Sequence, residues 1–129
     1  MQKEILNLDD IKKLVDCFYT KVKEDEMLKD IFNNVIEDRW PEHLEKMYTF
    51  WQTVLLEEHT YYGAPFMPHA NLPVSKKHFD RWLALFYETL DELFEGEKAE
   101  EARWRATKMA EMFQLKIAQY QQTNSKPLI

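Results

Sequence analysis

Residues 61–75 read Tyr-Tyr-Gly-Ala-Pro-Phe-Met-Pro-His-Ala-Asn-Leu-Pro-Val-Ser, and this stretch decides how the rest of the chain is organised. Its three prolines remove backbone donors and Gly63 favours a turn, so no regular helix runs through it. The segments on both sides repeat apolar residues at helical spacing. A loop of this length in a small domain is uncommon and is typically functional. His69 is its only histidine, and it stands between Pro68 and the Leu-Pro pair further on.

Length and composition predict one globular domain over residues 1–129, with loose ends at 1–7 and 123–129. Hydrophobic residues make up 45% of the chain and only two residues are glycines, which favours a helical core over a sheet with many tight turns. The net charge of −6 disfavours nucleic acid as a partner. The absence of a signal core or a long apolar run disfavours a membrane. The single Cys17 permits no internal disulfide and fits a reducing cytoplasm.

The chain order predicts an all-α fold of five helices. We expect them at about 8–23, capped by Asn7 or Asp9, at about 25–32, from Trp40-Pro41 onward, from Lys76 to about Phe94 with Ser75 as cap, and at about 98–121. The segment 33–39 is expected to be irregular, and Gly96 is expected to end the fourth helix.

Several side chains along these helices could belong to either a core or a site. Tyr19 flanks the first apolar stripe and is either half-exposed or directed inward. His43 shares one helix line with Met47 and Phe50, where most histidines are core residues. Its place one turn inside the helix also puts it near the mouth of any pocket, with Lys46 beside it.

The four histidines do not fit a protein-only metal site. None has a glutamate three residues before it, as di-iron bundles require, and no two lie four residues apart, as zinc proteases require. A single-histidine metal site needs ligands from a cofactor, and haem supplies four nitrogens itself. His69 is favoured over His78, which sits in a first helical turn among lysines, and over His59, which lies at the end of the third helix. On pattern alone His78 stays open as the alternative.

A set of short motifs in fixed order resembles the truncated haemoglobins, and more narrowly their third group. The resemblance extends from about residue 8 to 118, and it rests on ordered spacing over nearly the whole chain. The glycine pairs of the other truncated groups are missing, which departs from the wider family. The motifs are Phe18-Tyr19, Ile31-Phe32-Asn33-Asn34, Trp40-Pro41-Glu42-His43, Phe50-Trp51, Tyr62-Gly63-Ala64-Pro65, Pro68-His69, Leu72-Pro73 and Trp82-Leu83-x-Leu85-Phe86.

The resemblance implies a two-on-two helical sandwich around haem b, with His69 as the proximal iron ligand. It implies Tyr19, His43 and Trp82 on the distal, ligand-binding side. The haem-contacting set that it implies comprises Phe32, His43, Lys46, Met47, Phe50, His69 and Trp82, with Lys46 near a propionate. His43 is expected to donate to ligand, to gate the pocket, or to bind the iron itself.

The function that the resemblance implies is reversible binding of dioxygen and other small ligands (nitric oxide, carbon monoxide, cyanide and peroxide) at a five-coordinate iron. Oxygen transport by a cytoplasmic protein is one physiological form of this. The enzyme alternative is a haem-dependent peroxidase or nitric oxide dioxygenase with an external reductase, because the chain has no flavin or nicotinamide motif. A cofactor-free helical interaction module is the remaining alternative. The aromatic residues, 14% of the chain, would then serve only as core.

Overall fold

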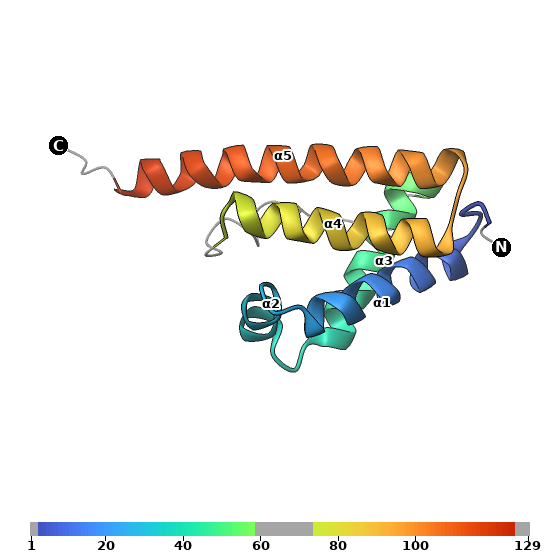
Figure 1. Ribbon diagram of the computed structural model, residues 1–129, viewed down its shortest axis with the longest axis horizontal. Helices are drawn as coiled ribbons and strands as arrows, with labels where there is room; N and C mark the ends of the chain where they lie inside the picture. The colour runs from blue at the N-terminus through green and yellow to red at the C-terminus, as the bar shows by residue number, and fades with distance from the viewer. Residues whose placement is uncertain (1–2, 59–73, 126–129) are drawn as a thin grey trace.

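A computed structural model of the chain describes residues 3–58 and 74–125, with side chains described up to residue 119. Within these ranges the fold consists of five helices: α1 (Leu8–Glu24), α2 (Lys29–Ile36), α3 (Trp40–Leu56), α4 (Lys76–Leu93) and α5 (Glu97–Ser125). The pair α4 and α5 runs antiparallel along one side of the molecule, α1 lies below α4 in this view, and α3 passes behind (Figure 1). In the described ranges no helix is both long enough and apolar enough to cross a bilayer.

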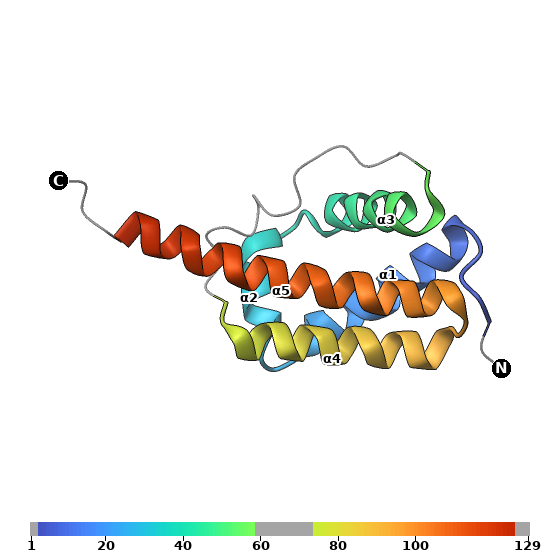
Figure 2. The ribbon, with the colours of Figure 1, turned by 90° about the horizontal axis from the view of Figure 1, so that it is seen from above.

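The core forms where α1 packs against α3 and α4, and where α4 packs against α5. The predicted stripe of α1 is confirmed as fully buried, from Ile11 to Val22. On α5, alanines at four-residue spacing let the helix approach α4 closely, and Ala106 is 0% exposed. Of the helix pairs that make substantial contact, α3 with α5 makes the smallest contact. Seen from above, α3 stands apart from α4, with α1 and α5 passing between them (Figure 2).

The second helix does not begin where we expected. The sequence predicted a helix over about 25–32 and irregular structure from 33 to 39, but α2 begins at Lys29 and ends at Ile36. The reason lies in Asp25, whose carboxylate accepts hydrogen bonds from the backbone N–H groups of Met27 and Leu28. These bonds form a turn that delays the helix by one turn.

In the described residues, the segments near both ends differ from the expectation of loose structure. The segment 3–7 is not loose, because Ile5 is 1% exposed and the Glu4 carboxylate accepts hydrogen bonds from the backbone N–H groups of Glu97 and Lys98. Glu4 thereby caps the first turn of α5. Gly96 makes this approach possible: its φ is +100°, and a Cβ there would lie 2.2 Å from the Glu4 carboxylate. At the other end α5 continues to Ser125, past the predicted end at residue 121.

Candidate functional site

Tyr19 lies on the buried face of α1 and points into the interior. Its side chain is 6% exposed, and its ring contacts Phe18 edge-on at 4.9 Å between centroids. Burial raises the pKa of the Tyr19 hydroxyl, because the phenolate would lose its hydration. The hydroxyl therefore stays protonated at neutral pH and is available as a hydrogen-bond donor.

His43 lies one turn into α3 and meets Tyr19. The two ring centroids are 5.1 Å apart with planes at 88°, and the His43 Nε2 atom is shielded from solvent. Pro41 in the first turn of α3 sets the direction of the helix. Trp40 completes the arrangement by packing edge-on against Tyr19 at 5.8 Å and against His43 at 5.7 Å.

Trp40 is itself held by two neighbouring helices. Its indole N–H donates to the Asn33 side-chain oxygen at 3.2 Å, and the Lys23 ammonium lies 4.4 Å from its ring. The sequence placed Trp40 at a helix start and in a family motif but predicted no contact with Tyr19 or His43, because nothing local reveals that α1 and α2 would surround it. Phe32 of α2 also reaches Tyr19, at 6.2 Å between centroids. The structure thus brings Phe32, Tyr19 and His43 together.

Trp82 joins this group only through an intermediate ring. The indole of Trp82, on α4, contacts Phe18 edge-on at 5.3 Å and stacks on Phe86 at 5.7 Å. Phe18 in turn touches Tyr19. Trp82 and Tyr19 therefore approach the same interior region from different helices, with Phe18 packed against both.

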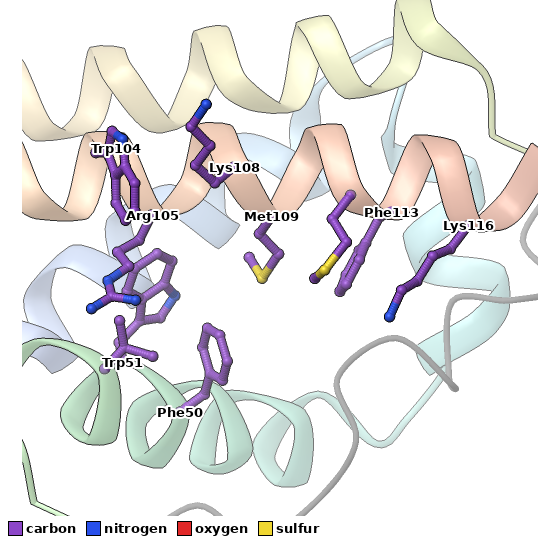
Figure 3. A pocket seen from close by; sticks show the side chains of 10 residues that line it. Phe50, Trp51, Trp104, Arg105, Lys108, Met109, Phe113 and Lys116 are labelled. Carbon is purple, nitrogen blue, oxygen red and sulfur yellow. The ribbon is translucent and has the colours of Figure 1, made fainter.

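The remaining expected contacts lie along α3. Met47 and Phe50 are half-buried and Lys46 is exposed. Phe50 lines a pocket of about 420 Å³ between α3 and α5 (Figure 3). Trp51 and Val54 share the α3 wall, and the α5 wall consists of Trp104, Arg105, Lys108, Met109, Met112, Phe113 and Lys116.

The α5 wall combines apolar and basic side chains, and its role was not predicted. Met109 and Phe113 were expected only as inward core residues. The basic residues Arg105, Lys108 and Lys116 recur at helical spacing beside that stripe. This pattern was readable in the sequence, but without α3 opposite it did not indicate a pocket.

His69, the expected iron ligand, lies outside the described residues, and so does His59. His78 is described: its Nδ1 accepts a hydrogen bond from the backbone N–H of Ser75 at 2.9 Å. The Ser75 side chain completes a reciprocal cap at the start of α4. His78 thus has a structural role in capping.

Comparison with known proteins identifies the family. Residues 5–117 match the family model described as bacterial-like globin. The chain is 37% identical over 124 residues to the group 3 truncated hemoglobin ctb of Campylobacter jejuni, which covers 93% of this chain and 98% of that protein. The crystal structure of the group III truncated hemoglobin from Campylobacter jejuni superposes with a TM-score of 0.83, covering 91% of this chain and 95% of that one, at 37% identity.

The chain belongs to the group III truncated haemoglobins. The predicted fold class and family are thereby confirmed. Membership of the truncated globins implies haem-based binding of small gaseous ligands. The cofactor-free interaction module is therefore not retained.

The described residues fit a haem. Pockets for cofactors commonly measure about 300–1,000 Å³ and are mostly apolar, and the pocket between α3 and α5 falls in that range. Haem is a flat apolar ring with two carboxylates at one edge. Phe50, Met109 and Phe113 supply apolar walls, and basic side chains such as Lys116 stand at the rim (Figure 3).

Proposed function

We propose that this truncated haemoglobin binds haem b through His69 and reversibly binds dioxygen and related small ligands beside Tyr19, His43 and Trp82. The observation that carries the proposal is the contact between the Tyr19 and His43 rings, 5.1 Å apart, at the N-terminal end of the apolar face of α3. A protonated phenol and an imidazole in the interior are suited to stabilise a polar ligand. Haem, when bound, supplies an iron with an open sixth position for a diatomic molecule.

We propose that residues on both faces of the haem ring hold the haem in place. His69 would supply the axial imidazole, while Phe32, Met47 and Phe50 would contact the apolar ring. Lys46, exposed on α3, would pair with a propionate. The engagement of the His78 Nδ1 in the α4 cap supports His69 over His78. A cytoplasmic location belongs to the same proposal, since the single Cys17 fits a reducing compartment.

Tyr19 and Trp82 would favour ligands that carry negative charge. Dioxygen draws electron density when it binds, and carbon monoxide draws little. A hydrogen bond to a charged group contributes about 1.5–3 kcal/mol, or about one to two decades in a dissociation constant. Slow oxygen release and discrimination against carbon monoxide follow from a buried, protonated Tyr19.

Ligand release from Tyr19→Phe tests this assignment. We expect oxygen to dissociate about 10–100-fold faster, from the loss of one such hydrogen bond, while carbon monoxide release changes much less. Tyr48→Phe is the matched control, because the Tyr48 hydroxyl donates to Asp16 on α1 at the surface. An oxygen off-rate that is unchanged in Tyr19→Phe would remove Tyr19 from this role.

The axial assignment has its own test. His69→Gly should lose the native absorption spectrum and recover it when free imidazole is added. A native spectrum in the variant before any imidazole is added would contradict the assignment. The ferric spectrum of the native protein, compared with His43→Leu, separates iron coordination by His43 from hydrogen bonding and gating.

A second candidate function is haem-dependent oxidation with peroxide, supplied with electrons from outside the protein. The observation that favours it is the stack of Trp82 on Phe86, with planes at 3°, which extends from the proposed distal side into the core. Donors such as Tyr19 and Trp82 would also assist cleavage of an O–O bond. Nitric oxide dioxygenation would use the same donors and an external reductase. Steady peroxide-dependent oxidation of a dye, lost in Trp82→Phe, would favour this second candidate.

A further inference from the structure

A line of stacked aromatic rings runs from Trp82 through Phe86 to Trp51. Trp82 stacks on Phe86 at 5.7 Å with planes at 3°, and Phe86 stacks on Trp51 at 5.2 Å with planes at 20°. Both separations are those of strongly packed aromatic pairs. Phe86 is 1% exposed and Trp51 is 4% exposed, so this part of the line is sealed from water.

Trp104 is an exposed tryptophan that shares a pocket wall region with Trp51. Trp51 and Trp104 line the same end of the pocket between α3 and α5, beside Arg105 (Figure 3). Trp104 is 55% exposed, which makes it one of the most exposed large apolar side chains among the described residues. The half-buried Trp82, the buried rings of Phe86 and Trp51, and the exposed Trp104 thus lie in order from the proposed distal side toward the surface.

We propose that Trp82, Phe86, Trp51 and Trp104 form a relay that carries oxidising equivalents from the haem pocket to reductants too large to enter it. This inference rests on the proposed function, in particular on haem and its reaction with peroxide. Indoles lose an electron far more readily than a phenyl ring does. In this relay the three tryptophans are the side chains that are oxidised in turn. Phe86 lies between Trp82 and Trp51.

Each cycle at Trp104 transfers one electron and one proton. Trp104 gives one electron inward, and its oxidised indole loses the N–H proton to water. The Arg105 guanidinium, 5.4 Å from the ring, favours that loss because it repels the positive charge of the oxidised indole. A phenol or an aromatic amine at the surface then returns one electron and one proton to Trp104. Two such donors reduce one hydrogen peroxide to two waters and leave as two radicals.

Trp40 offers an alternative route for electron transfer to the surface. It is half-buried and touches Tyr19 at 5.8 Å, so an electron could also leave the distal side through α3. The Trp104 route differs in ending on a side chain with a large exposed area, which a bulky donor can reach from solvent. The two routes predict oxidation at different tryptophans, which makes them separable.

The relay is tested by treating the haem-loaded protein with hydrogen peroxide and a nitroso spin trap, followed by peptide mass spectrometry. We expect the trap on Trp104. In Trp51→Phe the label on Trp104, per peroxide consumed, should fall to the background seen in Trp104→Phe. Tyr87→Phe is the matched control, because Tyr87 packs between α4 and α5 but lies off the line.

Full labelling of Trp104 in Trp51→Phe, or labelling of Trp40 alone, would overturn the relay. Should Trp51→Phe fold poorly, Trp104→Phe changes only an exposed side chain and should slow oxidation of a bulky phenol; an unchanged rate counts against the relay. A protein without a haem absorption band overturns the proposed function as well. A haem protein that consumes peroxide and stays unlabelled at Trp104 overturns the relay alone.

Discussion

Helices α1 and α3 have the same length, 17 residues, but they are buried to very different degrees. Seven residues of α1 are buried, whereas on α3 only Trp51 and Leu55 are. The α3 sequence is nevertheless rich in apolar side chains, and Met47 and Phe50 remain half-buried within the described part of the chain. Burial of apolar area is the main stabilising term in folding, so contacts within the protein account for most of the stabilisation of α1. The apolar face of α3 is suited to a group that the protein binds.

The largest expected effect comes from a matched pair of leucines on these two helices. Leu14→Ala on α1, at a position that is 0% exposed, should lower the free energy of unfolding by about 2–5 kcal/mol, because it leaves a cavity. Leu44→Ala on the half-buried face of α3 should cost about 1 kcal/mol in the haem-free protein. Denaturant unfolding of both variants measures the difference. Equal losses of unfolding free energy in the two variants would contradict the proposed difference between α1 and α3.

The next effect concerns the ionic contacts that attach the N-terminal segment to α1. Burial alone would raise the pKa of the Asp10 carboxyl, but the hydrogen bond from the Leu6 N–H, at 2.9 Å, and the Lys3 ammonium outweigh it and lower that pKa. The stabilisation is therefore present above about pH 3.9, the ordinary value for aspartate, and is lost as pH falls through the lower folded value.

Asp10→Asn should accordingly lower the free energy of unfolding by about 1.5–3 kcal/mol at neutral pH, as expected for a hydrogen bond to a charged group. Urea unfolding at a series of pH values checks this. The gap between variant and native protein should narrow as pH falls below about 3.9. A gap that is independent of pH would mean that the carboxylate charge contributes nothing.

The smallest effect lies at the contact between α1 and α3. Partial burial, together with the hydrogen bond to Asp16 and the charges of Asp16 and Glu45, raises the pKa of Tyr48 to about 12. Because the protonated phenol is favoured in the fold, this stabilisation is present below pH 10, about the ordinary tyrosine value, and is lost as pH rises further. The phenolate absorbance lost in Tyr48→Phe should titrate with a midpoint of about 12. A midpoint near the ordinary value would show that the bond to Asp16 does not persist in solution.

The same contrast explains what the sequence could and could not predict. Period-3.6 stripes predicted the buried faces of α1 and α5, and Asn7 is confirmed as the cap of α1, accepting from the Asp10 N–H at 3.1 Å. These are local features. The Glu4 carboxylate caps α5 more than 90 positions away in the chain, a contact that no local pattern contains. The start of α2 is delayed to Lys29 because the Asp25 carboxylate accepts a hydrogen bond from the backbone N–H of Leu28.

The candidate site likewise has features that the sequence predicted and features that it did not. Periodicity left Tyr19 open between a surface and an interior position, and the structure places it inside. Its meeting with His43 and Trp40 depends on the crossing of α1 and α3, which follows from the packing of the whole domain. The basic residues of the pocket, such as Lys116, could be recognised as part of a pocket wall only once α3 was placed opposite them.

We expect bound haem to cover the half-buried apolar face of α3. The most direct test is proton NMR of methyl-labelled protein with carbon monoxide-bound ferrous haem, whose ring current shifts the protons that lie close to it. With one equivalent of haem, the methyl signal of Met47 on α3 should shift strongly, while that of Ala99, buried at the start of α5, should stay in place. Shifts at Ala99 with none at Met47, or no shift at either, would contradict the account.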